Sequence, residues 1–471
     1  MKLYNTKTKT IDTFNPLVPN KVGMYSCGPT VYDYSHIGHL RTYVYTDVLK
    51  RALLNNGYEV KHVMNITDVG HLSGDDDSGE DKMEKGVKKF GKSIDEIVKY
   101  FTDFFFASTD SVNIIRPDII CSATVHIKEM INLIKILEQK GFTYSTEEAV
   151  YFDISKLHAY GVLSKQKLDE KKLQAREEVY SDPGKKHPAD FALWFKKTGR
   201  FKDHILHWSS PWEDGFPGWH IECSAMSMKY LGPTFDIHTG GVDHIPTHHE
   251  NEIAQSEAAT GKEFVRYWFH AEFLLVDGVK MSKSLGNLFT YKDVLEKGFN
   301  PISMRFLFLQ THYRQAMNFT WTALQSAEIA LNKIYETIDQ LKKQTQRAQL
   351  SEEKLSQVET FKNTFDEYMN DDLKTPSAIA ILWEVIKSNI PSEDKLDLLY
   401  AFDEVLGLSL RSSHKTEISE EVIKLAEARL EARRQKDFRA SDDLRKLIKE
   451  KGYDIEDTDS SYLLKKAFLR V

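Results

Sequence analysis

His36 and His39 flank an Ile-Gly pair early in the chain. The apolar run over 22–27 predicts a buried strand, and the turn residues after it predict a loop before a helix from about 39 to 56. Both imidazoles would then lie near a helix N-terminus, whose N–H groups and dipole attract anionic oxygens. Gly38 would let a flat ring approach the backbone, and both imidazoles could donate hydrogen bonds to a phosphoryl group. Simple helix caps show the same pattern.

Lys280 and Lys283 belong to a Lys-Met-Ser-Lys-Ser run in the second half of the chain. Two lysines among small hydroxyl residues are typical of a mobile cationic loop that neutralises a leaving pyrophosphate. Chemistry of this kind depends on positioning and charge neutralisation, so it requires no protein nucleophile. The lysines and the histidines can cooperate only if a divided α/β sheet brings both motifs to one crevice.

A third group of residues has the character of a metal site: Cys27, Cys223, His248 and Glu252. His248 and Glu252 are four residues apart and would share a helix face, and two thiolates would complete four ligands typical of Zn²⁺. Spacing alone leaves other histidines as rivals for the imidazole position: His249, His244 and His238. Simple packing of two buried cysteines is a further alternative.

Length and composition indicate a soluble globular protein. The 471 residues suggest two to four domains, and 41% hydrophobic with 28% charged residues is an ordinary balance. Apolar stretches fall far short of the roughly 20 residues that cross a bilayer, and the N-terminus lacks a signal peptide, so we expect a cytoplasmic protein without membrane contact. Three cysteines exclude a disulfide framework. Cys121 has no candidate metal ligands near it in the sequence and is expected in the core.

The order of elements predicts an α/β fold with a parallel sheet. Strand, loop, helix and strand over residues 22–66 open such a sheet, and a second set of short strands and helices follows from about 219 to 286. The charged stretch 164–187 indicates an insertion between the two halves. We therefore expect a Rossmann-like catalytic domain whose halves are residues 1–115 and 216–315, with an insertion over 116–215, an all-α bundle over 316–408 and a small terminal domain over 409–471.

The last third of the chain is predicted to be helical. Apolar residues with helical spacing form one stripe: Leu324, Ala327, Leu331, Ile334, Ile338 and Leu341. Further helices are expected over about 351–369, 376–389 and 393–407, then a polar linker over 409–419, two basic helices and a short strand near 453–455. The chain carries a net charge of −7, but residues 424–451 hold ten basic and six acidic residues. A solvated helix face or an anionic partner would explain this surplus.

Taken together, these motifs resemble class I aminoacyl-tRNA synthetases and, among them, the cysteinyl-tRNA synthetases. The His-Ile-Gly-His and Lys-Met-Ser-Lys-Ser runs match the class without substitution, and residues 218–226, 240–243 and 248–252 resemble cysteine-specific blocks. Residues 65–68 and 371–376 also fit, so the resemblance covers essentially the whole chain. The sequence departs from the common family pattern at Pro246-Thr247 and after Thr458.

The resemblance implies a role for each motif. The catalytic residues would be His36, His39, Lys280 and Lys283. ATP would be bound by His36, Gly38, His39, Gly240, Gly241, Asp243 and Lys283. The metal ligands would be Cys27, Cys223, His248 and Glu252, and Thr67 and Trp219 would line the amino-acid pocket. The terminal domain would bind the tRNA anticodon, and its basic residues would contact the RNA: Arg433, Arg434, Lys436, Arg439 and Arg445.

The activity implied by the resemblance is an ATP-dependent ligase. It would activate L-cysteine to cysteinyl-adenylate, with Mg²⁺ accompanying ATP, and transfer the cysteine to the 3′ end of tRNA(Cys), acting as a cytoplasmic monomer. Shape alone separates near-isosteres such as cysteine and serine by no more than about 10²-fold. One Zn²⁺ per chain would supply the remaining discrimination between cysteine and serine, because it deprotonates and binds a thiol far better than a hydroxyl.

Three alternatives remain open at this stage. A cysteine ligase with the same adenylating core could use an amino sugar as acceptor, although a small acceptor needs no C-terminal reader. A zinc hydrolase could use Glu250 as its base, but this leaves the two-lysine loop unexplained. A non-catalytic RNA-binding module with structural zinc would turn over no ATP.

Overall fold

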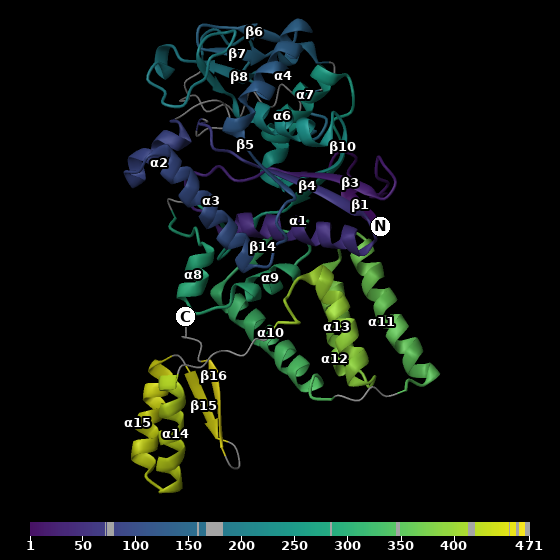
Figure 1. Ribbon diagram of the computed structural model, residues 1–471, viewed down its shortest axis with the longest axis vertical. Coiled ribbons are helices and arrows are strands. Elements are labelled where there is room, and N and C mark those ends of the chain that lie inside the picture. Colours follow the sequence, from purple (N-terminus) through teal and green to yellow (C-terminus); the bar gives the residue numbers. More distant parts are fainter. Residues whose placement is uncertain are drawn as a thin grey trace.

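A five-stranded parallel sheet forms the centre of the protein, in the order β11-β10-β3-β4-β5 (Figure 1). Its strands are β3 (Lys21–Ser26), β4 (Glu59–Ile66), β5 (Ile119–Ser122), β10 (Phe235–Gly241) and β11 (Val265–Ala271). The chain builds outward from β3 through β4 to β5, and outward in the other direction from β10 to β11. Strand order therefore reverses between β3 and β10, and open α/β sheets bind ligands at such a point.

The computed structural model describes residues 1–70, 72, 80–157, 160–165, 182–282, 285–344, 349–412, 420–451, 453–457 and 461–466. Among these residues, no helix combines the length and the apolar character that crossing a bilayer requires. Lys283 lies outside the described residues, and so does most of the linker predicted over 409–419.

Helices cover both faces of the sheet. Helix α1 (Ile37–Asn55) lies along one face, while α4 (Ile127–Gln139), α6 (Trp219–Leu231) and α7 (Glu250–Thr260) pack together on the other (Figure 1). Helices α2 (Lys82–Phe90) and α3 (Ile94–Ser111) follow β4. Helix α1 begins two residues before the predicted start because His36 caps it. The predicted α/β class and the divided parallel sheet are confirmed.

The insertion is a four-stranded antiparallel sheet, in the order β6-β7-β8-β9. Its strands are β6 (Thr143–Ser145), β7 (Ala149–Phe152), β8 (Phe191–Lys196) and β9 (Gly215–Pro217). Two boundaries need correction: the division predicted at residue 115 separates β5 from the parallel sheet to which it belongs, and the division predicted after residue 215 cuts through β9. The sequence gives no signal for either boundary, because strands this short cannot show a period.

A small sheet and two helices lead out of the catalytic region. Strands β12 (Leu274–Val276), β13 (Val279–Lys280) and β14 (Met317–Phe319) form the sheet, and α8 (Tyr291–Glu296) and α9 (Pro301–Leu309) lie between β13 and β14 in sequence. An N-terminal hairpin, β1 (Lys2–Asn5) and β2 (Thr10–Thr13), contacts β11. Short turns of 3₁₀- or π-helix complete this part: Ala123–His126, Ile154–Lys156, Gly199–Phe201, Val242–His244 and Ile245–His249.

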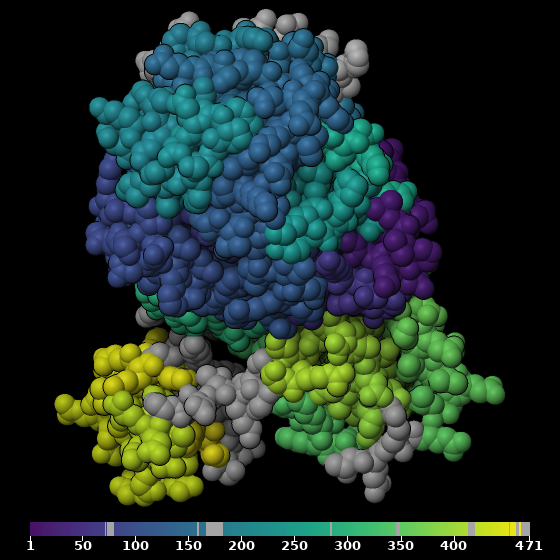
Figure 2. Space-filling view, turned by 45° about the horizontal axis from the view of Figure 1, so that its top comes forward, coloured from purple at the N-terminus to yellow at the C-terminus, as the bar shows by residue number. Residues whose placement is uncertain are grey.

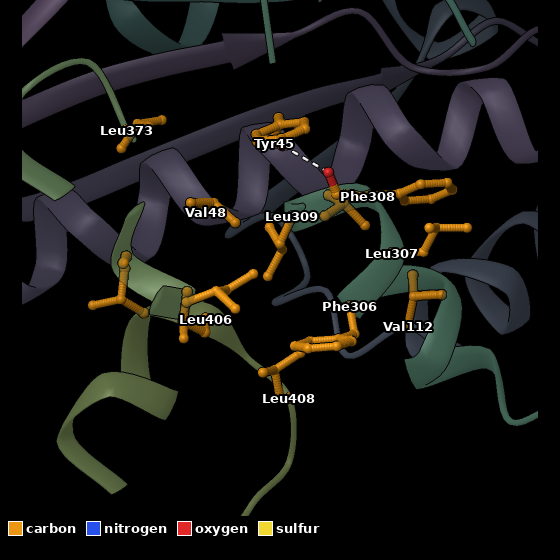
Figure 3. Packing of buried hydrophobic residues seen from close by; sticks show 14 of the residues in the cluster. Tyr45, Val48, Val112, Phe306, Leu307, Phe308, Leu309, Leu373, Leu406 and Leu408 are labelled. Carbon is orange, nitrogen blue, oxygen red and sulfur yellow. Dashed lines mark hydrogen bonds between the residues drawn. The ribbon is translucent and has the colours of Figure 1, made fainter. Parts of the chain in front are cut away.

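The predicted bundle consists of α10 (Trp321–Leu341), α11 (Glu352–Asn370), α12 (Thr375–Lys387) and α13 (Ser392–Leu406). The stripe predicted on α10 is buried, apart from the half-buried Leu341. Figure 3 shows that the bundle and the catalytic region share one core, in which Tyr45 and Val48 of α1 face α9 and the segment 406–408. The Tyr45 hydroxyl also donates a hydrogen bond to the Phe308 carbonyl, at 2.9 Å. The bundle is thus packed directly against α1.

The C-terminal residues form a separate small unit at the lower left of Figure 1. It comprises α14 (Glu420–Arg434), α15 (Phe438–Glu450), β15 (Tyr453–Asp457) and β16 (Tyr462–Lys466), with its own core of Val422, Ala426, Ile448 and Ile455. The two basic helices and the first strand agree with the prediction. The second strand, β16, was not predicted; it pairs antiparallel with β15.

Candidate active site

A cavity of about 740 Å³ lies at the carboxyl ends of β3 and β10, where the strand order reverses. Residues predicted from separate motifs share its wall: Cys27, His36, His39, Thr67, Trp219, Cys223, Gly240, Gly241, Asp243 and His248. Met281 and Ser282, from the lysine-containing loop, also line it. The fold therefore brings both halves of the sheet and both motifs to one site.

The two motif histidines cap α1 reciprocally. The Nδ1 atom of each ring accepts the backbone N–H of the other residue at 3.3 Å, and the rings stack with centroids 3.5 Å apart. An Nδ1 atom that accepts a hydrogen bond carries no proton, so each neutral ring has its proton on Nε2. His36 and His39 therefore cap α1, and a proton on Nε2 is compatible with the donor role predicted from the sequence.

The loop after β13 lies against the start of α1. A β-carbon at Gly38 would overlap the Met281 side chain, and the Ile37 N–H donates to the Phe289 carbonyl at 2.8 Å. Gly38 thus admits Met281 close to the backbone. Lys280 is exposed in β13 and its ammonium lies 5.2 Å from the centre of the Phe273 ring, so it does not line the cavity in this conformation.

The two glycines at the end of β10 allow close packing beneath the cavity. A β-carbon at Gly240 would lie 2.6 Å from His249 Cε1 and 2.9 Å from His244 Nδ1. One at Gly241 would overlap the carboxylate of Asp243. A larger residue at either position would displace these polar side chains. Gly28 is equally constrained, since its β-carbon would overlap the Asn65 carbonyl.

The four predicted metal ligands converge, and each is buried. One donor atom from each of Cys27, Cys223, His248 and Glu252 lies within 4.8 Å of the others. The two sulfurs are 3.6 Å apart, and His248 Nε2 lies 3.1 Å from Glu252 Oε1. Pro246 and Thr247 lie in the π-helical turn that leads into α7.

A second set of ligands satisfies the same distance limit: Cys27, His238, His249 and Glu252. In this set His238 Nε2 lies 2.9 Å from Glu252 Oε2, and His249 Nε2 lies 3.5 Å from Cys27 Sγ. Only the first set contains both thiols, which matches the ligand preference of Zn²⁺ more closely.

The electrostatics of this cluster favour a cation. Burial opposes the ionisation of Glu252, but the charges of His238 and His248 and their hydrogen bonds hold its pKa well below the usual value. Burial likewise opposes ionisation of Cys223, yet contacts with Cys27 and His248 lower its pKa. Burial opposes a charge on His248, but Glu252 and Cys223 raise its pKa to about 10, so this ring balances the negative charges here, and a divalent metal bound by the same donors would replace its proton.

The predicted amino-acid pocket includes an acidic residue that the sequence did not reveal. Thr67 Oγ1 donates to Glu222 Oε2 at 2.8 Å and accepts from Asn65 Nδ2 at 3.0 Å. Glu222 is fully buried, and burial raises its pKa well above the usual value. The Trp219 ring stacks on His248 with centroids 4.3 Å apart. Trp219 thus contacts a candidate metal ligand, and Thr67 lines the same cavity.

Glu250 does not act as the base that a hydrolase would need. Its carboxylate accepts four consecutive backbone N–H groups, from residues 161–164, at distances of 2.8 to 3.0 Å. It is buried and is absent from the cavity wall. Its function is to fasten the insertion to the first turn of α7, between two ligand positions.

Replacing Glu250 with glutamine tests this assignment. The amide can accept only part of the four hydrogen bonds, and each unsatisfied buried N–H costs about 1–3 kcal/mol. We expect a lower thermal midpoint and faster tryptic cleavage of the insertion, with an unchanged KM for ATP. Complete loss of turnover in a variant that unfolds like the wild type would instead indicate a chemical role.

The five basic residues predicted to contact RNA are all exposed: Arg433, Arg434, Lys436, Arg439 and Arg445. Two of them form weak ion pairs, Arg433 with Asp457 at 3.4 Å and Arg434 with Glu431 at 3.8 Å. A further arginine of this unit is structural instead: Arg429 is buried and donates to both oxygens of Asp457.

Comparisons with known proteins agree with this geometry. Residues 13–329 match the family model of the tRNA synthetases class I (C) catalytic domain. The chain is 45% identical to a cysteine--tRNA ligase of Treponema denticola, covering 97% of this chain and 98% of that protein. It is 43% identical to cysteine--tRNA ligase 1 of Burkholderia lata, covering 97% and 95%. These coverages extend the likeness across nearly the whole chain.

Solved structures show the same fold at low identity. A Mycobacterium tuberculosis methionyl-tRNA synthetase in complex with methionyl-adenylate superposes with a TM-score of 0.57 at 15% identity, over 82% of this chain and 90% of that one. A ternary complex of an Agrobacterium radiobacter K84 LeuRS with tRNA and LeuAMS superposes with a TM-score of 0.57 at 12% identity, covering 84% of this chain and 85% of that one.

Proposed function

The chain belongs to the cysteine--tRNA ligase family of class I aminoacyl-tRNA synthetases, and from this premise we propose how its residues perform the reaction. The substrates are ATP, L-cysteine and tRNA(Cys). One observation carries the proposal: a single cavity is lined by both motif histidines, both motif cysteines and His248.

In the first step, an oxygen of the cysteine carboxylate attacks the α-phosphorus of ATP, and the bond to pyrophosphate breaks. His36 and His39 donate hydrogen bonds from Nε2 to the oxygens that gain charge in the transition state. Mg²⁺ enters with ATP and, with Lys280 and Lys283, offsets the charge of pyrophosphate. Gly38, Gly240, Gly241 and Asp243 shape the nucleotide site. The Lys280 ammonium must leave the Phe273 ring to reach the pyrophosphate.

Cys27, Cys223, His248 and Glu252 would hold one Zn²⁺ next to the amino-acid pocket. When bound, this ion supplies thiol selectivity, because a soft thiolate is a far better ligand than a hydroxyl. The protein supplies the surrounding contacts: Thr67 positions a polar group, the Trp219 ring forms a wall, and the insertion holds α7 through Glu250.

In the second step, a terminal ribose hydroxyl of the tRNA attacks the adenylate carbonyl, and AMP leaves. Residues 409–471 would read the anticodon through the five exposed basic residues of α14, α15 and the turn between them, and the bundle over 316–408 would connect this unit to the catalytic region. We propose that residues 1–122 and 218–315 form the catalytic domain, which places β5 with the parallel sheet and β9 with the insertion.

Cysteine-dependent exchange of labelled pyrophosphate into ATP tests the first step, and charging of tRNA(Cys) tests the second. We expect both, with serine supporting neither at comparable concentration. Exchange without tRNA charging, but with an amino sugar as acceptor, would favour the alternative ligase. Absence of exchange would reject the whole assignment. A monomeric state and a cytoplasmic location stay predictions; light scattering of the purified protein checks the first.

A further inference from the structure

Helix α2 places an unusual concentration of positive charge at the mouth of the cavity. Residues 82–92 contain five lysines and one acidic residue, Glu84, while Asp75, Asp76, Asp77, Glu80 and Asp81 precede them in the sequence. Lys82 and Lys89 line the cavity, together with Asp33 and Tyr34. Neither the adenylation step nor the anticodon contacts use this helix.

The helix is held firmly against the catalytic region. Met83 is completely buried, and Gly86 packs so closely that its β-carbon would lie 3.2 Å from the Tyr32 carbonyl. Asp81 caps the first turn by accepting the Glu84 N–H, and Gly91 ends the helix in the left-handed conformation. The lysines of α2 are therefore presented by a rigid element.

Exposed aromatic rings adjoin these lysines. Tyr34 and Tyr100 are 39% and 37% exposed, and their hydroxyl oxygens lie 3.2 Å apart. The ammonium of Lys92 lies 4.8 Å from the centre of the Tyr100 ring, and that of Lys89 lies 4.7 Å from the centre of the Phe90 ring. We call the five lysines of residues 82–92, with Tyr34 and Tyr100, the α2 surface.

Among the residues that the structure describes, acidic side chains neutralise this charge only in part. Lys89 pairs with Asp33 at 3.0 Å and Lys88 with Glu80 at 3.8 Å, whereas Lys85 pairs with no described acidic residue. Exposed ion pairs contribute about 0–1 kcal/mol, so a polyanion can displace them. Cations interleaved with exposed rings are typical of surfaces that bind unpaired nucleic acid, because phosphates contact the cations and bases stack on the rings.

We propose that the α2 surface binds the unpaired 3′ end of the tRNA as it enters the cavity. This inference rests on the proposed function, which requires the terminal ribose to reach the adenylate. Unpaired nucleotides fit better than a duplex, because only splayed bases can stack on Tyr34 and Tyr100. Figures 1 and 2 both place α2 and the α14–α15 unit toward the same side of the molecule, so one RNA can contact both.

The double variant Lys85→Gln/Lys88→Gln tests the charge, since neither residue lines the cavity. Each lost contact with a single-strand phosphate lowers the slope of log K against log salt concentration by about 0.7. We expect a slope smaller by about 1.4, weaker tRNA binding and unchanged cysteine-dependent pyrophosphate exchange. Lys354→Gln/Lys362→Gln on α11 is the matched control, with the same charge change and no expected effect on tRNA binding.

Two RNA probes and a ring variant sharpen the test. The lysine double variant should weaken the binding of intact tRNA more than the binding of the same tRNA without its last three nucleotides. An equal loss of affinity for both RNAs would overturn the proposal and indicate contacts with the double-stranded part. Tyr100→Leu should raise the KM for tRNA about tenfold, while Tyr100→Phe, which keeps the ring, should not. Unchanged tRNA binding in both the lysine and leucine variants, with normal exchange, would reject the α2 surface alone. Absent exchange in the wild type would reject the proposed function instead.

Discussion

Replacing Cys223 with serine is expected to remove the bound metal and to lower the rate of cysteine-dependent pyrophosphate exchange by more than about 10²-fold. Changes beyond the direct ligands of a metal already cost about 10–100-fold, and loss of a ligand costs more. A serine hydroxyl stays protonated at neutral pH and coordinates poorly. Metal content per chain and the exchange rate at saturating ATP are the measurements.

Cys121→Ser is the matched control for this variant. Cys121 is also buried, but its thiol donates to the Met64 carbonyl at 3.5 Å and belongs to neither candidate ligand set. Its metal content and exchange rate should stay close to those of the wild type. A Cys223→Ser protein that keeps one metal per chain and normal exchange would contradict the ligand assignment.

His248→Asn and His249→Asn separate the two candidate ligand sets. Both rings are fully buried, and each set contains one of them. If Cys27, Cys223, His248 and Glu252 are the ligands, the His248 variant loses the metal while the His249 variant retains it. Loss of the metal from the His249 variant alone would instead identify the ligands as Cys27, His238, His249 and Glu252.

The sequence was most informative where the signal is local. A capping pattern is contained within four residues, so the position of His36 and His39 at the start of α1 could be predicted directly. Helical spacing similarly identified the buried face of α10. In contrast, Cys27 and Cys223 are separated by 196 residues, and their proximity depends on the pairing of β3 with β10. Only the family resemblance selected His248 from its neighbours.

Glu222 and Glu250 show why the rest could not be predicted. Both glutamates lie within sequence motifs, next to Cys223 and His249, and both are buried. Glu222 is buried against Thr67, which donates a hydrogen bond to it, and Glu250 is buried against the backbone N–H groups of residues 161–164. These partners lie far away in the sequence, and a glutamate whose partners are unknown is predicted to be exposed.

Asp47→Asn is expected to lower the free energy of unfolding of the catalytic region by about 3–5 kcal/mol, the cost of removing one partner from a buried ion pair. Asp47 Oδ2 accepts from Arg305 at 2.6 Å and from Arg51 at 2.8 Å. Arg305 is fully buried and also donates to the carbonyls of Val112 and Leu406. The carboxylate of Asp47 is thus the negative charge that balances a guanidinium linking α1, α9 and the end of α13.

Urea unfolding followed by tryptophan fluorescence measures this loss, and Asp366→Asn is the control. Asp366 pairs with Lys362 on the surface at 2.9 Å, so its replacement should change the free energy by less than about 1 kcal/mol. An Asp47→Asn protein as stable as this control would show that the buried arginines find other partners. Because α1 carries His39 at one end and Asp47 in its middle, the same variant should also slow pyrophosphate exchange under conditions where it remains folded. That joint loss follows from one arrangement: the helix that presents the two motif histidines is held in place by a charge contact with Arg305 of α9.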